Sequence, residues 1–206
     1  SLNLSYDSRE LPISVKPDEK VSVEKVMRLL METYTGSRFD VLQNLKINDS
    51  TTAVAANPWM LRDTRDMINA VKPGTVPNNR NIAVPQCSYS TVIQLHRDLP
   101  DAIGGILWLS FDNPGQSPRI PVFCGTTELP ALFDICGQPR YDENAIVWKY
   151  RKTNKMATVR WGATKNEMFG AIDHFIEKGQ REIPFVREQY KKIVKEQGEQ
   201  AANQFL

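Results

Sequence analysis

The sequence predicts an α+β fold in which antiparallel strands are followed by helices. Two runs, residues 88–95 and 103–111, have the composition of neighbouring strands, and a turn at Leu99-Pro100 separates them. The last third of the chain instead repeats apolar residues at helical spacing. Because the strands follow each other directly, we expect an antiparallel sheet, with the later helices packed against it.

Composition narrows the class of protein. The chain has 206 residues, 41% of them apolar and 24% charged, so it can form one large domain or part of a larger one. The net charge is +2, and the Lys and Arg residues are spread along the chain, so the sequence gives no reason to expect nucleic-acid binding. No apolar run reaches membrane-spanning length. The three cysteines have no zinc-site or disulfide-framework spacing, and we expect neither metal nor cofactor.

The chain is expected to form a single segment with three regions. Residues 1–21 are polar and contain two prolines, which indicates an extended arm. Residues 22–140 hold a helix capped by Ser22 and then the strands, and residues 141–206 are helical. The sequence opens at Ser1 without a methionine, so we expect a processed product or a segment of a longer protein. Nothing in it indicates a cellular location.

The second strand is apolar on both faces, from Ile106 to Leu109. Such a strand must be covered on both sides, for example by helices on one face and a second sheet on the other. A third strand is expected at residues 118–124. It should lie at a sheet edge or a bulge, because Pro121 has no N–H to donate to a ladder.

The helical region is divided by its capping and breaking residues. Asp142 is expected to cap a helix over residues 143–159. Thr164 and Glu167 form a capping-box pattern that predicts the start of a second helix, which Gly179 should end. A third helix should follow Pro184 and fray from residue 195 onward.

Nucleophile chemistry within the chain has little support. A Cys–His dyad requires contact, but about 30 Å of extended chain separates Cys87 from His96. Cys124 ends an apolar strand, where a buried and inert thiol is expected. Ser1 could act as an N-terminal nucleophile only if a strand followed it directly, and a polar arm follows instead. A dyad would have to be drawn from Cys87, Cys124, Cys136, His96 and His174, and the cysteines are instead expected to be structural.

Two polar segments lie at the ends of predicted elements, where binding sites are often built. They are "TGSRFD", which ends at Asp40, and "NNRN", which contains Arg80. Turn and capping roles explain both segments as well, and the residues alone favour those roles.

A longer stretch resembles the C-terminal half of the secernin-like cysteine dipeptidases, which are N-terminal-nucleophile hydrolases related to choloylglycine hydrolase. "TGSRFD" is similar to that family's Thr-x-x-Asp turn, and "YDENAIVWKYR" to one of its helices. The specific part of the resemblance is a series of short matches: Arg80-Asn81-Ile82, Ser88 to Gln94, Leu99-Pro100, Trp108-Leu109, Pro114, Pro121-Val122 and Gly125.

The resemblance implies a four-layer αββα fold of which this chain is the C-terminal half. It also implies a cysteine nucleophile in the N-terminal half, outside this chain, that cleaves dipeptides or small amides through a thioester. Arg80 would serve the active site, and Asp40 and Ser88 would contact substrate. The implied partners are the substrate, the N-terminal half and, in a homo-oligomer, further copies. Residues 113–116 differ from the family, so the preferred substrate is left open. The alternative is a non-catalytic α+β interaction or structural domain.

Overall fold

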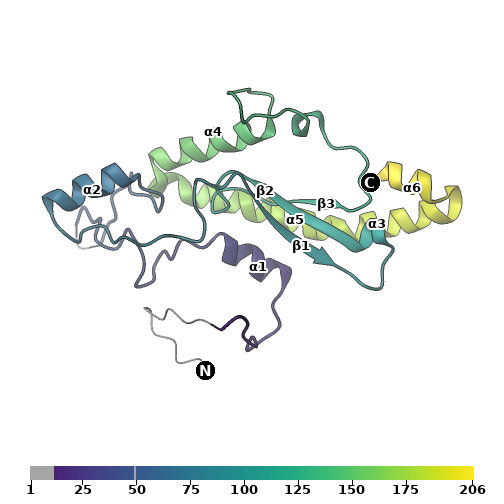
Figure 1. Ribbon diagram of the computed structural model, residues 1–206, viewed down its shortest axis with the longest axis horizontal. Helices are drawn as coiled ribbons and strands as arrows, with labels where there is room; N and C mark the ends of the chain where they lie inside the picture. Colours follow the sequence, from purple (N-terminus) through teal and green to yellow (C-terminus); the bar gives the residue numbers. More distant parts are fainter. Residues whose placement is uncertain (1–11, 49) are drawn as a thin grey trace.

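The computed structural model describes residues 12–48 and 50–206. Ser1 and the first part of the predicted arm lie outside these residues, and the three-region division stays a prediction. Figure 1 shows a small sheet in the middle of an elongated molecule. The elements are α1 (Val23–Leu30), α2 (Arg62–Val71), β1 (Tyr89–Leu95), α3 (Asp101–Gly104), β2 (Gly105–Phe111), β3 (Ile120–Phe123), a 3-10 turn (Ala131–Phe133), α4 (Ile146–Val159), α5 (Trp161–Gln197) and α6 (Glu199–Phe205).

The three strands form an antiparallel sheet in the order β1-β2-β3, as the sequence predicts. Val92 lies opposite Trp108, which in turn lies opposite Pro121. Pro121 is therefore on an edge strand. Because Cys124 N donates to Gly105 O at 3.0 Å, the alternation of an antiparallel ladder places Pro121 at a position that forms no bond to β2. The missing N–H costs the sheet nothing.

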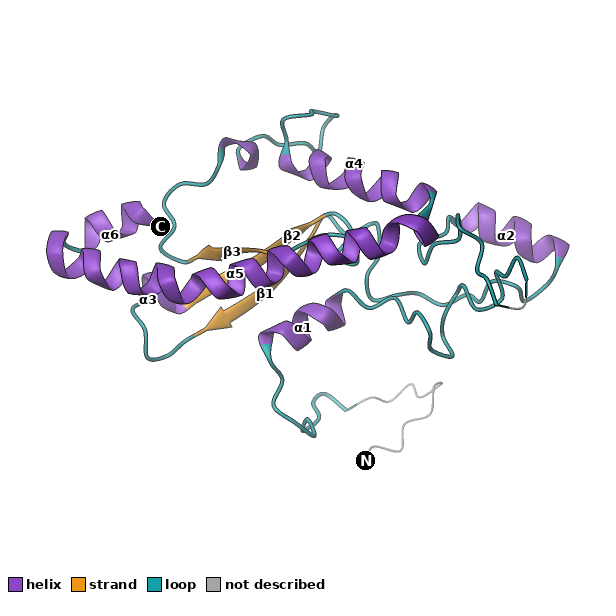
Figure 2. Cartoon of the chain, turned by 180° about the vertical axis from the view of Figure 1, so that it is seen from behind, coloured by secondary structure: helices purple, strands orange, loops and turns teal. Residues whose placement is uncertain are grey.

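Helices cover one face of the sheet. The long helix α5 runs along this face, with α1 beside it (Figure 2). Ser22 caps α1 as predicted, its side chain accepting from Lys25 N at 3.1 Å. The main core forms between these helices and the sheet, and its buried members are Met27, Val92, Ile106, Trp108, Ile172, Ile176 and Ile183.

The opposite face of the sheet is open. Tyr89, Ile93 and Leu95 are 65%, 69% and 76% exposed, and the register places Leu107 and Leu109 on the same face. The expected cover on both faces of β2 is thus present on one face. Within residues 12–48 and 50–206, no second sheet packs against the open face.

The start of the helical region differs from the sequence prediction. Helix α4 begins at Ile146 rather than residue 143, and Asp142 instead accepts from Asn144 N at 2.9 Å in a local turn. The capping box is wrong as well, because Thr164 lies inside α5 and donates to Ala157 O at 2.7 Å.

Two predicted breaks in α5 are also wrong. The helix continues through Gly179 and Pro184 to Gln197. Gly179 is buried against the sheet, and Pro184 is exposed, so the proline costs one helical hydrogen bond on the solvent side. The tail does not fray, because α6 folds back on α5, where Tyr190 Oη donates to Asn203 Oδ1 at 2.9 Å.

None of the helices in the described part of the chain is both long and apolar enough to cross a membrane.

Candidate functional site

The loop that leaves β2 carries an unusual set of buried polar residues. It begins at Asp112, which is 2% exposed and adopts the left-handed backbone conformation with φ 58°. The Asp112 N–H donates to Ser88 O at 3.0 Å, which fixes the loop to the start of β1. Asn113, Gln116 and Ser117 follow, and each is at most 3% exposed. So much buried polarity is expected only where every group has a partner.

Helix α4 supplies the partners of Asp112. Its carboxylate accepts from Arg151 Nε at 2.8 Å and from Asn154 Nδ2 at 2.9 Å, one bond to each oxygen. Asn154 Nδ2 also donates to Ser117 Oγ at 2.9 Å. The charge of Asp112 is therefore both paired and hydrogen-bonded, and these contacts join α4 to the loop.

The remaining amides close the loop on itself. Asn113 Nδ2 donates to Gln116 Oε1 at 2.9 Å, and Gln116 Nε2 donates to Asn154 O at 3.1 Å. A Cβ on Gly115 would come within 2.9 Å of both Ala83 and Trp59, so glycine permits the loop to approach those residues. Sequence reasoning missed this cluster. Its signal was the polar run Asp112 to Ser117 between two apolar strands.

Two adjoining cavities lie beside this loop. The first has a volume of about 420 Å³, and Asp112, Gln116 and Asn154 contribute to its lining. The second, called here the Arg80 cavity, has about 580 Å³ and is lined in part by Arg80 and Asn81. The two share the wall formed by residues 59–61 and Pro85.

The Arg80 cavity is lined by two residues with polar groups that lack a partner among the described residues. Arg80 is exposed and makes no hydrogen bond or ion pair with another residue that the structure describes. Asn81 is 7% exposed, and its Nδ2 donates to Pro58 O at 2.8 Å. Its buried Oδ1 has no partner within the described ranges. The cavity thus combines a permanent cation with an unsatisfied acceptor, which suits a ligand carrying both a carboxylate and an N–H donor.

The other two predicted site residues lie apart from this cavity. Asp40 forms a turn, accepting from Gly36 N at 2.9 Å and Leu42 N at 2.8 Å. That turn is joined to the loop preceding Arg80 through Asn79 Nδ2, which donates to Phe39 O at 3.0 Å. Ser88 is exposed and contacts the Asp112 loop through its carbonyl. The substrate-binding roles of Asp40 and Ser88 stay predictions, as does the role of Arg80.

The cysteines correct one expectation. Cys124 follows the end of β3 as predicted, but its side chain is exposed rather than buried. Its Sγ lies over Gly105, where a Cβ would come within 2.3 Å of the sulfur. The alternation of β3 places it on the open face of the sheet with Val122, and that open face is the physical reason for its exposure.

No Cys–His dyad is found in the part of the chain that the structure describes. The ring of His96 pairs with the Gln94 amide at 2.9 Å, and His174 packs on Phe175. Over residues 12–48 and 50–206, no three His, Cys, Asp or Glu side chains gather in a way that could hold a metal ion.

Comparison with known proteins identifies the family. A family model described as peptidase family C69 matches residues 2–177. A curated protein from Latilactobacillus sakei, the "Probable dipeptidase", is 23% identical over 159 residues, which are 77% of this chain and 28% of the relative. The chain therefore spans less than a third of that relative's length. No solved structure matches the chain. These findings confirm the resemblance seen in the sequence, and the chain belongs to peptidase family C69.

Proposed function

We propose that this chain is part of a cysteine-type dipeptidase and that it contributes the Arg80 cavity to the substrate site. The family match and the relative named as a probable dipeptidase support a peptidase. The observation that carries the proposal is the pairing of an unengaged guanidinium, Arg80, with the unsatisfied Asn81 Oδ1 on one cavity.

A dipeptide carries the groups that this cavity would recognise. Its carboxylate fits the planar fork of Arg80, and an N–H of its amide or amine can donate to Asn81 Oδ1. A volume of about 580 Å³ is ample for such a substrate. The buried network around Asp112 would keep the adjoining wall from moving when the substrate binds.

In the proposed reaction, a cysteine thiolate from a part of the protein outside this chain attacks the peptide carbonyl carbon. The C–N bond then breaks, and the leaving amine takes the proton that the nucleophile's own α-amine removed from the thiol. Water adds to the resulting thioester and releases the N-terminal amino acid of the dipeptide together with the free thiol. A guanidinium nearby would also lower the pKa of that thiol.

The same proposal accounts for the open face of the sheet. Tyr89, Ile93 and Leu95 present a large apolar surface that a soluble domain rarely leaves uncovered. We propose that a sheet from the remaining part of the protein covers it and completes a four-layer αββα arrangement. Until that cover is present, self-association of the chain through this face is expected.

A non-catalytic interaction or structural domain is the second candidate. The observation that favours it is the engagement of both Asp112 oxygens by residues of α4, which gives that carboxylate a structural role. The open sheet face would then serve a lasting partner rather than a catalytic half.

Measurement of dipeptide hydrolysis by the full-length protein tests the proposed roles of Arg80. Arg80→Lys keeps the charge but loses the fork, so it should mainly raise KM if Arg80 holds the substrate carboxylate. If the charge acts on the thiol, Arg80→Lys should be nearly silent, whereas Arg80→Ala should move the pH profile upward. Arg97→Ala, an exposed arginine outside the cavity, serves as the control. Wild-type kcat/KM in both Arg80 variants would remove Arg80 from the site.

The 206-residue chain alone provides a second test. It should show no sustained hydrolysis of dipeptides. Turnover that Cys124→Ala or Ser1→Ala abolishes would show that the nucleophile lies within this chain after all.

A further inference from the structure

Arg119 is a buried cation without a counter-charge. It precedes β3, is 1% exposed, and reaches across the sheet to β1. Its two terminal nitrogens donate to Ser90, to the carbonyl at 3.0 Å and to Oγ at 2.9 Å. Its Nε is buried and has no partner, and no carboxylate of the described residues forms an ion pair with it. An isolated buried charge is costly unless an anion compensates it.

The two neutral partners of Arg119 do not explain its charge. Ser90 supplies hydrogen-bond acceptors that a neutral donor could equally use. Burial lowers the pKa of Arg119 to about 10, which still leaves the guanidinium charged at neutral pH. A charge retained in such a place is typical of a site whose anion comes from a ligand.

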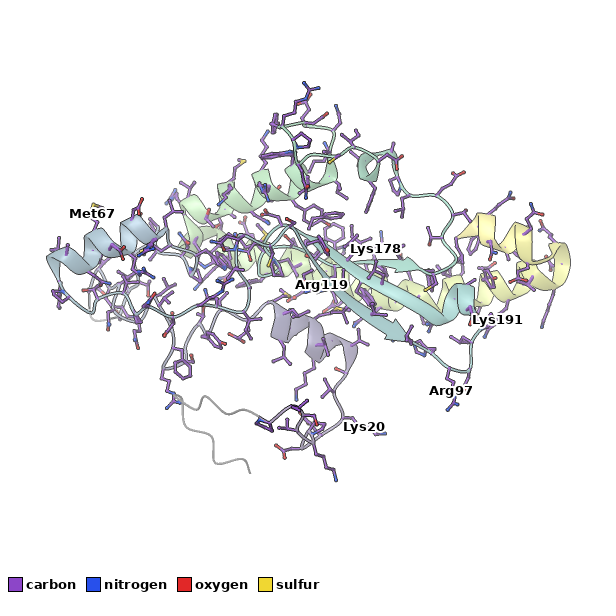
Figure 3. All side chains as sticks on the ribbon, in the orientation of Figure 1. Lys20, Met67, Arg97, Arg119, Lys178 and Lys191 are labelled. Atoms are coloured by element: carbon purple, nitrogen blue, oxygen red, sulfur yellow. The ribbon has the colours of Figure 1, made fainter. Side chains whose placement is uncertain are left out.

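A cavity of about 290 Å³, the Arg119 cavity, lies against this residue. Its walls are mostly apolar: Pro118, Ile120, Pro121, Phe175 and Gly179. It shares no lining residue with the Arg80 cavity. Figure 3 labels Arg119 beside β2 and Lys178 on α5, near the centre of the molecule.

Tyr150 adds a second donor to this cavity. Its hydroxyl makes no hydrogen bond with another described residue, and burial raises its pKa to about 12, so it remains a donor. At the rim, Lys178 Nζ lies 3.9 Å from Glu182 Oε1. Because the charges of Lys178 and Glu182 compensate each other, the positive charge of Arg119 remains without a counter-charge.

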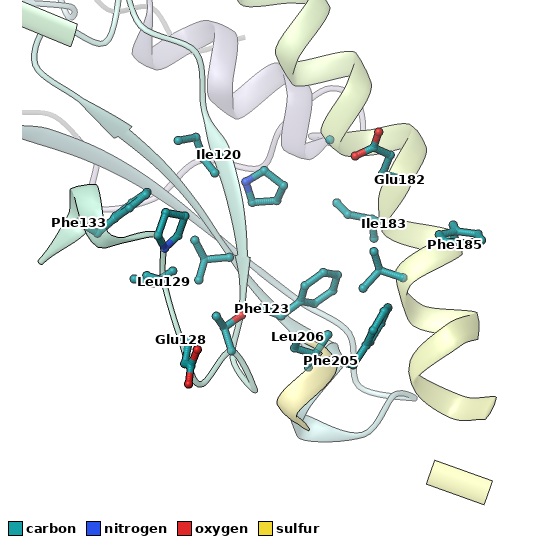
Figure 4. Close-up of a pocket in the computed structure, with 16 residues that line it drawn as sticks. Ile120, Phe123, Glu128, Leu129, Phe133, Glu182, Ile183, Phe185, Phe205 and Leu206 are labelled. Atoms are coloured by element: carbon teal, nitrogen blue, oxygen red, sulfur yellow. The ribbon is translucent and has the colours of Figure 1, made fainter. Parts of the chain in front are cut away.

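A larger groove begins beyond Glu182 (Figure 4). It has about 750 Å³ and runs between β3 and α5 toward Leu206, and it shares Ile120, Pro121, Gly179 and Glu182 with the Arg119 cavity. Its charged lining residues are Glu128 and Glu182, both acidic. An anion is therefore favoured in the Arg119 cavity and disfavoured in the groove.

We propose that the Arg119 cavity binds a small carboxylate that carries an aromatic or branched apolar group. The carboxylate accepts from Arg119 Nε and from the Tyr150 hydroxyl, which satisfies the unpaired donor and neutralises the buried charge. The apolar group packs against Phe175 and the two prolines. The cavity is at the small end of the range for ligand pockets, which limits the ligand to a compact molecule.

Calorimetric titration of the 206-residue chain with phenylacetate tests the proposal. Phenylacetamide has the same shape without the charge. We expect phenylacetate to bind at least about tenfold more tightly than phenylacetamide, and Arg119→Met to remove that preference. Arg97→Met alters an exposed arginine outside the cavity and should leave binding unchanged. Equal binding of the acid and the amide, or undiminished binding of the acid by Arg119→Met, would overturn the proposal.

A second pair of variants covers the case in which Arg119→Met fails to fold. Phe175 is 52% exposed on α5 and forms a wall of the cavity, whereas Phe185, 64% exposed on the same helix, does not line it. Phe175→Ala should weaken phenylacetate binding, and Phe185→Ala should not. Equal effects of these two changes would likewise rule out the Arg119 cavity as the binding site.

Discussion

Gly179 lies where α5 packs tightly against the sheet, and replacing it tests how that helix packs. A Cβ there would lie 3.2 Å from both Trp108 Cζ3 and Pro121 Cγ. Trp108 is 1% exposed, and its Nε1 donates to Gln94 Oε1 at 3.0 Å, so the indole cannot shift without losing that bond. Overpacking costs about 1–3 kcal/mol, and the better helix propensity of alanine returns about 1 kcal/mol. Gly179→Ala should therefore lower the unfolding free energy by up to about 2 kcal/mol.

Gly170 provides the matched control on the same helix. No atom lies within 4 Å of its Cβ position, so Gly170→Ala should stabilise the chain by about 1 kcal/mol through propensity alone. Urea unfolding of both variants should give midpoints on opposite sides of the wild-type value at an unchanged slope. If Gly179→Ala stabilises the chain as much as Gly170→Ala does, α5 does not contact Trp108 as described.

Three other changes test separate features. Asp112→Ala removes an acceptor from the buried Asn154, which keeps its bond to Ser117, and from Arg151, whose side chain is 34% exposed. It should cost about 1–3 kcal/mol in urea unfolding, whereas the exposed Asp66→Ala should cost less than about 1 kcal/mol. Cys124 should react with a thiol reagent in the native chain at nearly the rate of a free thiol, and a slow reaction would show that it is covered. Burial raises the pKa of Tyr150 from 10.0 to about 12. The stability contributed by this raised pKa is complete below about pH 10 and is lost as pH rises toward 12. Tyr150→Phe should therefore reduce the fall in unfolding midpoint over that range, and an unchanged fall would contradict the shift.

The parts of the fold that could be predicted are those with local causes. Alternation and the Leu99-Pro100 turn correctly predicted the β1–β2 pair, and the lack of an N–H on Pro121 correctly predicted an edge strand. Ser22 caps α1 because its hydroxyl needs only a backbone N–H three residues away. Each of these signals acts within a few residues, so no knowledge of the packing was required.

The continuity of α5 could not be predicted in this way. Gly179 and Pro184 both favour a break when the local sequence is considered alone. In the structure, Gly179 is needed for contact between the helix and the sheet, and helix packing outweighs the one bond lost at Pro184. The predicted burial of Cys124 was wrong for a related reason. The strand before it is apolar, but the sheet face on which Cys124 lies is open.

The candidate site shows which of its polar residues are available for chemistry. Buried polarity alone points to Asp112, yet both of its oxygens already accept hydrogen bonds, so its role is to hold the loop in place. Across the shared wall, Arg80 and the Asn81 Oδ1 have no such partners. An unpaired acceptor in a buried position costs about 1–3 kcal/mol, a cost that a bound N–H donor would remove. Under the proposed function, the Asp112 cluster is the support, and Arg80 with Asn81 Oδ1 is the pair from which a substrate would gain binding energy.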